Sequence, residues 1–325
     1  MKKHLWTAIR ILISLGLIAF ILLKVDLKLL LAHLHSTRLA YVVLAVFGYL
    51  LIVFICAYRW RLLLRVQEIN SEIEYLASLF FIGLFFNNFL PTSFGGDLLR
   101  LYYIAEESGK KSESFASILV DRATGFFATL FVAFLALIFL LHQQQGQNML
   151  KIVIIISAIV ALLGVLFFSR RIVRRFRFIL NLPLIVKIED KIKKAYNSIY
   201  LYRKKPVIIA KTFLISCVIQ FLLVTVIYLL ALSLRLNLPM LPFFLYVPVI
   251  SLISMIPISI NAWGLQEGSY VVLFGQAGLG KESALALSLF VHFLLVFISL
   301  FGGVIFLIQG GRSLKSKKIK PKLKI

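Results

Sequence analysis

Long apolar runs separated by short polar segments dominate the sequence. The hydrocarbon core of a bilayer is about 30 Å thick and is crossed by roughly 20 apolar residues in an α-helix. We predict six full transmembrane helices, at about 6–23, 39–57, 115–141, 149–168, 207–234 and 283–308. No small-residue cleavage site follows the first run, so we expect an uncleaved anchor rather than a signal peptide. The pattern therefore predicts an all-α polytopic membrane protein.

Two further apolar stretches, about 75–104 and 241–276, are interrupted by asparagine, proline and glycine at 87–97 and 257–268. Proline removes a backbone donor and glycine disfavours a continuous helix. Irregular backbone at membrane depth is tolerated only inside protein or beside a water-filled cavity. We therefore predict two re-entrant hairpins, each made of two half-helices. Eight complete spans are the alternative.

Composition supports a membrane protein: 61% of the 325 residues are hydrophobic and 15% are charged, which excludes a soluble enzyme, a disordered chain and a secreted disulfide scaffold. The formal net charge is +23. With both termini in the cytoplasm, most Lys and Arg fall in cytoplasmic segments, as the positive-inside rule requires. We expect one membrane domain over 1–311, with a basic cytoplasmic loop at 169–206 and a basic cytoplasmic tail at 312–325. These basic segments are expected to anchor the topology, with the gathering of anionic lipid near the site as the alternative, and no nucleic-acid partner is expected.

The two interrupted stretches resemble each other. When their breaks are aligned, Asp97 falls near Glu267, and with the same offset Arg122 falls on His292 in the following span. One unit enters the membrane from the cytoplasm and the other from outside. This arrangement predicts an inverted repeat, which in transporters places the substrate site between two broken helices. Chance similarity between two apolar hairpins is the alternative.

Ionisable residues inside the predicted spans indicate where a functional site lies and which groups it would bind. Each costs at least about 2.5–3.5 kcal/mol at the bilayer centre, so it marks a functional site by default. The half-helix that begins at Gly95–Gly96 would aim its N–H groups at an anion, and Arg100 and Arg122 would add forked donors for phosphate oxygens. Asp97 would orient Arg100. The alternative is that Asp97 only caps the half-helix while Asp121 and Arg122 satisfy nearby backbone.

Glu267 and His292 form the outer counterpart, either as a proton carrier or as a hydrogen-bonded pair that closes the outer half. Asn87, Asn88 and Asn261 would serve the turns as hydrogen-bond formers, and Trp263 would serve them as an interfacial ring. Only one of the five histidines lies within a span, so no metal or cofactor site is predicted. The candidate substrate-binding residues are Asn88, Pro91, Ser93, Gly95, Gly96, Asp97, Arg100, Asp121, Arg122, Glu267 and His292.

Two sequence blocks carry a family resemblance. The first runs from Asn88 through Gly95-Gly96-Asp97 to Asp121-Arg122, and the second runs from Pro257 through Trp263-Gly264 and Glu267-Gly268 to Gly302-Gly303. The chain resembles, over nearly its whole length, the lysylphosphatidylglycerol synthase transmembrane (flippase-like) family. Asp121 departs from the glutamate expected there. The resemblance implies the membrane half alone, since no soluble synthase or glycosyltransferase domain is visible.

We therefore expect a flippase-like transporter in the cell membrane that moves an anionic or phosphate-bearing lipid, and not an enzyme. Its expected partners are membrane lipids, with a lipid-modifying transferase as a further candidate. Two alternatives remain: an intramembrane enzyme acting on a lipid phosphate, and a scaffold that supplies lipid to a partner transferase. The enzyme would need a nucleophile or metal beside a general acid.

Overall fold

The computed structural model describes residues 37–88, 95–142, 197–256 and 259–310, and every regular element in these ranges is helical. Four described helices are long and apolar enough to cross a membrane: Leu39–Val66, Lys111–Phe139, Pro206–Ser233 and Lys281–Ile308. The predicted spans 6–23 and 149–168, the tail 312–325 and most of the basic loop 169–206 lie outside the described residues.

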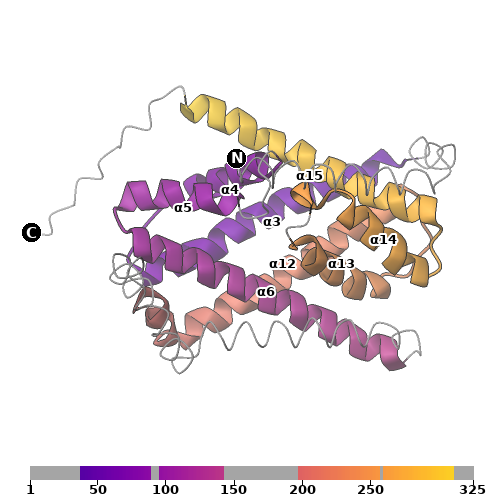
Figure 1. The fold of residues 1–325 in the computed structure, drawn as a ribbon, viewed down its shortest axis with the longest axis horizontal. Coiled ribbons are helices and arrows are strands. Elements are labelled where there is room, and N and C mark those ends of the chain that lie inside the picture. Colours follow the sequence, from indigo (N-terminus) through magenta and orange to yellow (C-terminus); the bar gives the residue numbers. More distant parts are fainter. Residues whose placement is uncertain (1–36, 89–94, 143–196, 257–258, 311–325) are drawn as a thin grey trace, which may run out of the picture.

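Four long helices form the frame of the molecule: α3 (Leu39–Val66), α6 (Lys111–His142), α12 (Pro206–Ser233) and α15 (Lys281–Gly310). They run roughly along its longest axis (Figure 1). The last three agree closely with the predicted spans. The prediction for α3 was wrong at its end, because the helix continues nine residues beyond 57 to Val66. Arg59, which we had counted in a cytoplasmic loop, is therefore a buried helical residue.

Both interrupted stretches are broken as predicted. The first forms α4 (Ile73–Asn87) and α5 (Gly95–Ser108), and the second forms α13 (Leu241–Ser254), the short η1 (Ile260–Ala262) and α14 (Leu265–Gln276). In the second break, Asn261 has φ 46° and Gly264 has φ 82°. The left-handed conformation favours asparagine and glycine, so these two residues allow the chain to turn back.

The packing of the helices repeats with the sequence. We define the first unit as α3–α6 and the second as α12–α15. Within the units, α4 packs on α5 and α5 on α6, as α13 packs on α14 and α14 on α15. Between the units, α4 packs on α15 of the second unit while α13 packs on α6 of the first. This exchange is what two structurally related units would produce, and it supports the predicted repeat.

One contact between the units is unusually close. A Cβ atom added at Gly302 of α15 would lie 1.9 Å from the carbonyl oxygen of Phe81 on α4. Small residues let helix backbones approach closely in membrane proteins. Gly302 therefore sets the distance between α4 and α15.

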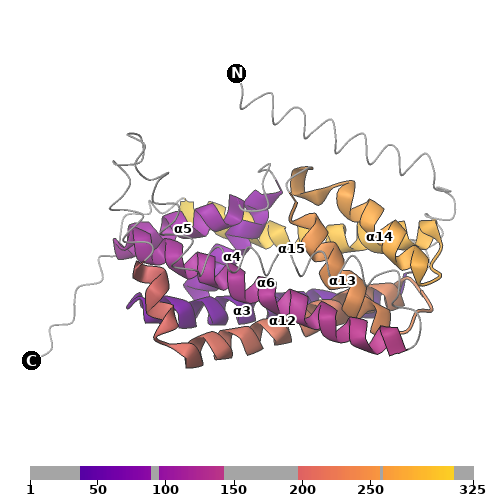
Figure 2. The same cartoon turned by 60° about the horizontal axis from the view of Figure 1, so that its bottom comes forward.

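The two short-helix pairs, α4–α5 and α13–α14, occupy opposite halves of the long axis (Figure 2). The Asn261 side-chain amide donates to Asn88 Oδ1 at 3.2 Å, and the Asn88 amide donates to Ser299 Oγ on α15 at 2.7 Å. The predicted turn-stabilising role of Asn261 is thus confirmed, and the bond joins the turn of one unit to that of the other.

Candidate functional site

A cavity of about 340 Å³ lies between the units. Residues of α3, α4, α5 and α6 line it on one side, and residues of α12 and the C-terminal end of α13 line it on the other. Three arginines and two aspartates face it: Arg59, Arg100, Arg122, Asp97 and Asp121. The cluster, which we call the arginine cluster, carries one surplus positive charge. The rest of the lining is largely apolar.

Asp97 lies at the centre of the predicted site. Its Oδ1 accepts a hydrogen bond from Arg100 Nη2, and its Oδ2 accepts one from Arg122 Nε. The Asp97 side chain is buried, whereas that of Arg122 is 42% exposed. This arrangement confirms the prediction that Asp97 orients Arg100, and it excludes a role limited to capping α5. It also places the predicted residues of α5 and α6 in one cluster.

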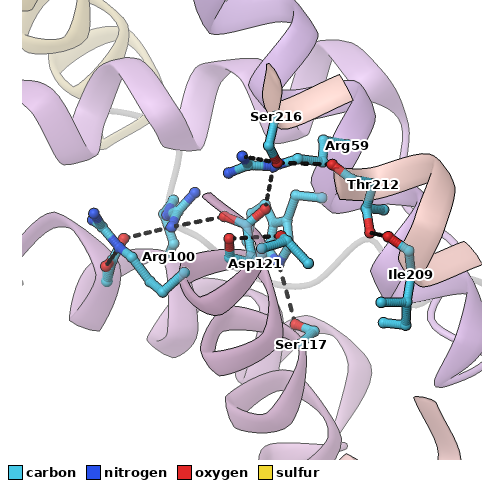
Figure 3. Close-up of polar contacts among 11 residues, drawn as sticks. Arg59, Arg100, Ser117, Asp121, Ile209, Thr212 and Ser216 are labelled. Carbon is cyan, nitrogen blue, oxygen red and sulfur yellow. Dashed lines mark hydrogen bonds and ion pairs between the residues drawn. The ribbon is translucent and has the colours of Figure 1, made fainter. Parts of the chain in front are cut away.

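Asp121 pairs with an arginine that sequence reasoning missed. Arg59 Nε donates to Asp121 Oδ1 at 2.8 Å, and Arg59 Nη1 donates to Ser216 Oγ on α12 at 2.8 Å (Figure 3). Ser216 in turn donates to the Thr212 carbonyl at 2.7 Å. Gly125, one turn beyond Asp121, leaves room for the Arg59 guanidinium, because an added Cβ would lie 3.3 Å from Nη1. The Asp121 side chain therefore holds Arg59, which is more than the backbone-satisfying role considered above.

Arg100 connects the two parts of the arginine cluster. Its Nη2 lies 3.8 Å from Asp121 Oδ2 as well as bonding Asp97. Its guanidinium lies 3.9 Å from the Phe80 ring centre and 4.8 Å from that of Trp60, at cation–π distance. Its buried Nη1 has no hydrogen-bond partner among the described residues. Arg100 is thus fixed by aromatic rings but retains donor capacity.

The N-terminus of α5 differs from the prediction in one respect. Gly95 and Gly96 begin the helix and are buried, but the Gly96 N–H donates to Asn87 Oδ1 at 2.6 Å. That donor is therefore already used, so the arginines remain the main donors for an anion. Pro91 and Ser93 lie outside the described residues. Asn88 bonds Ser299 and Asn261, and Asn87 rather than Asn88 lines the cavity.

Glu267 and His292 do not line this cavity but contact each other. His292 Nδ1 lies 2.6 Å from Glu267 Oε1, and both side chains are almost fully buried. Trp263 stacks on the His292 ring with centroids 4.1 Å apart and planes at 4°. The Trp263 ring thus packs on the buried histidine, a contact that the sequence did not predict. The acid of each unit contacts the basic residue of the next long helix, in keeping with the repeat alignment.

A larger cavity of about 760 Å³ lies elsewhere, between α6, the start of α12 and the helical residues 197–203. Its α6 residues are Val120, Ala123, Thr124 and Phe127, which occupy the face opposite to Asp121, Arg122 and Gly125. It is mostly apolar and offers little to orient a polar ligand. The smaller cavity is therefore the candidate site.

The arginine cluster has the chemistry of an anion site. Guanidinium groups donate in pairs to phosphate or carboxylate oxygens, and the surrounding apolar residues strengthen such contacts by excluding water. Asp97 supplies carboxylate oxygens to two of the arginines, in the way that a bound anion would. In the described ranges, no group of three or more His, Cys, Asp or Glu side chains is arranged to hold a metal ion.

Comparisons with known proteins agree with the resemblance. The family described as "Lysylphosphatidylglycerol synthase TM region" matches residues 7–303. A UPF0104 membrane protein of Methanothermobacter thermautotrophicus is 28% identical over 255 residues, which cover 71% of this chain and 72% of the relative. The UPF0104 membrane protein PH1989 of Pyrococcus horikoshii is 29% identical over 163 residues, or 49% of this chain and 47% of the relative. No solved structure gives a significant match.

Proposed function

The chain belongs to the lysylphosphatidylglycerol synthase TM region family, and from this premise we propose that it moves an anionic, phosphate-bearing lipid across the cell membrane. The supporting observation is the arginine cluster, whose three arginines and two aspartates line one cavity of an otherwise apolar membrane protein and leave a formal surplus of one positive charge. Ionisable groups in that setting are costly and mark a ligand site or a transport path by default. An anionic head group would neutralise the surplus.

Asp97 gives the site a way to bind and release such a head group. Its two oxygens accept hydrogen bonds from Arg100 and Arg122. A phosphate would compete for the same guanidinium groups, and Asp97 would reclaim them on release. An internal competitor keeps the arginines oriented without making the anion bind too tightly to leave. The exposed Arg122 side chain is the first contact available to the head group.

The location of the cavity fits transport of a lipid better than permanent binding of one. Its lining comes from both units, including Ser251, Leu252 and Met255 at the end of α13. A site between two related units can open to either side when the units rearrange, which is how inverted-repeat transporters alternate access. The lipid tails would stay in the hydrocarbon while the head group crosses beside the arginine cluster.

Replacing Arg122 by alanine is expected to slow leaflet exchange of an anionic lipid by at least about tenfold, because a hydrogen bond to a charged group contributes about 1.5–3 kcal/mol. The purified protein would be reconstituted into vesicles, and exchange of fluorescent phosphatidylglycerol and phosphatidylcholine would be followed by dithionite quenching. Wild-type protein should favour phosphatidylglycerol. Asp97→Asn should also alter the rate, because it removes a charge that orients both arginines.

The matched control is Lys211→Ala, which removes the same charge from an exposed position on α12 that does not line the cavity. It should exchange lipid at the wild-type rate. Mass spectrometry of the lipids after the assay would separate movement from chemical conversion. Wild-type rates in both Arg122→Ala and Asp97→Asn would show that the arginine cluster is not the site, and a converted lipid would favour the enzyme alternative.

A further inference from the structure

The second unit contains a buried acid–base pair that the arginine cluster does not use. Glu267 Oε1 and His292 Nδ1 are 2.6 Å apart, and the side chains are 3% and 2% exposed. Two lone pairs at that distance would repel, so at least one proton must lie on the pair. With a single proton, on the histidine nitrogen, the pair carries one negative charge. A second proton makes it neutral overall.

The described surroundings of the pair hold no compensating cation. Among the described residues, no Lys or Arg forms an ion pair with Glu267, so none of them balances a negative charge on the pair. Burying an uncompensated charge is costly, and such groups take up a proton instead. The arginine cluster differs, because its acids are each held by an arginine.

Neighbouring residues hold both groups in place. Glu267 Oε2 accepts a hydrogen bond from the Gly264 N–H at 2.6 Å, and Trp263 stacks on the His292 ring. Ser288, one turn before His292 on α15, is fully buried and its hydroxyl has no partner among the described residues. A hydroxyl at that position can donate or accept, so it is suited to pass a proton to the pair.

Among the described residues, Tyr270 is a titratable group with an electrostatic interaction with Glu267. It lies on α14, as Glu267 does. The remaining charged or titratable residues of the helices packed against α14 and α15 are Tyr246 on α13, Lys281 and Glu282 at the start of α15, Glu74 and Tyr75 on α4, Lys211, Cys217 and Tyr228 on α12, and Tyr41, Tyr49, Cys56, Tyr58, Arg59, Arg61 and Arg65 on α3. Glu267 and His292 are the only close acid–base pair of α14 and α15 in this part of the chain.

Hydrogen bonds join the segments that flank this pair to the segments that flank the arginine cluster. Asn261, two residues before Trp263, bonds Asn88, and Asn88 also bonds Ser299, which lies two turns after His292 on α15. Asn87, next to Asn88, accepts from Gly96, the neighbour of Asp97. A shift of α14 against α15 on proton binding would therefore reach the helix that carries Asp97 through two short segments.

We propose that Glu267 and His292 form a proton-binding site that couples lipid movement to a pH difference across the membrane, an inference that rests on the proposed transport function. One proton would enter the pair from the more acidic side, neutralise it, and leave to the other side as the units rearrange. No bond other than those to the proton changes, and the head group remains bound to the arginine cluster during the same rearrangement.

Vesicles with an imposed pH difference provide the transport test. A difference of one pH unit supplies about 1.36 kcal/mol per proton, so it should shift the leaflet ratio of labelled phosphatidylglycerol by up to about tenfold in wild-type protein. Glu267→Gln and His292→Gln should lose this shift. A wild-type ratio that ignores the pH difference, or a variant that keeps the full response, would overturn the coupling.

Trp263 provides a second readout that does not depend on lipid movement. A protonated imidazole quenches a stacked indole, so the fluorescence of the detergent-solubilised protein should titrate with pH. The titration should disappear in His292→Gln and Trp263→Phe and move in Glu267→Gln. A flat titration in folded wild-type protein would overturn proton binding. If fluorescence titrates but wild-type protein moves no lipid, the proposed function and the coupling fail together while the proton site stands.

Discussion

Replacing Asp121 by alanine is expected to lower the free energy of unfolding by about 3–5 kcal/mol, the usual cost of removing one partner of a buried ion pair. The Arg59 guanidinium would keep Ser216 but lose its nearest carboxylate, and Arg100 would lose a charge 3.8 Å away. Arg59 is buried, with 7% of its surface exposed. Thermal or denaturant unfolding of the purified protein in detergent, followed by circular dichroism, measures the change.

A second pair of variants isolates the interaction itself. Arg59→Met combined with Asp121→Leu removes both charges, so the double variant should be more stable than Asp121→Ala alone. Glu106→Ala, an acidic residue exposed on α5, serves as the control and should change stability by less than about 0.5 kcal/mol. Equal losses in Asp121→Ala and Glu106→Ala would mean that the Arg59–Asp121 pair does not stabilise the fold.

Replacing Gly302 by alanine is expected to destabilise the protein by about 1–3 kcal/mol or more, although alanine is the better helix former by roughly 1 kcal/mol. The added methyl group would lie 1.9 Å from the Phe81 carbonyl oxygen and 2.9 Å from the Ile82 nitrogen. Both atoms belong to the α4 backbone, which cannot move aside as a flexible side chain can. Helices α4 and α15 must therefore separate, and lipid exchange should fall because α4 also carries Phe80 and Gly83 of the cavity.

The control variant for this prediction is not expected to lose stability. Gly275 lies near the end of α14, and an added Cβ there would meet nothing within 4 Å. Gly275→Ala should be neutral or stabilising, since only helix propensity changes. Measuring both variants in the same detergent separates the steric effect from the intrinsic preference for alanine. A Gly302→Ala protein as stable as Gly275→Ala would refute the close contact between α4 and α15.

The broken helices were predictable because their causes are local. Several proline, glycine and asparagine residues close together in an apolar stretch favour a break in a helix, whereas single ones are tolerated, as Pro248 is within α13 and Gly302 within α15. The predicted stretches 75–104 and 241–276 accordingly agree with the pairs α4–α5 and α13–α14 to within a few residues. The contacts of Asp97 with Arg100 and of Glu267 with His292 were also predicted, whereas the contact of Asp97 with Arg122 was not.

Arg59 was missed because an arginine at the end of an apolar run looks like the start of a loop. The run Leu62-Leu63-Leu64 beyond it was the available signal, since it continues the helix and its burial. The groups that compensate the Arg59 charge are Asp121, which lies 62 positions after it in the chain, and Ser216, which lies 157 positions after it. Sequence spacing cannot show such pairings, because they depend on how α3, α6 and α12 pack.

The same limit applies to Trp263 and to the donors of α5. An aromatic residue beside a glycine turn is typical of a membrane interface, but here a histidine from α15 provides a flat partner. The Gly96 N–H was expected to be available, yet Asn87 at the end of α4 already accepts from it. In both cases the deciding contact comes from a neighbouring helix, and local residue types do not reveal it.

The exchanged packing of the two units has a consequence for biosynthesis. During translation the first unit is inserted before α13 and α15 exist, although these helices cover α6 and α4. Arg59 likewise receives its Ser216 contact only after α12 has been made. The nascent first half must therefore hold its charged residues within the membrane without their final neighbours, so maturation of the site depends on the later synthesis of α12, α13 and α15.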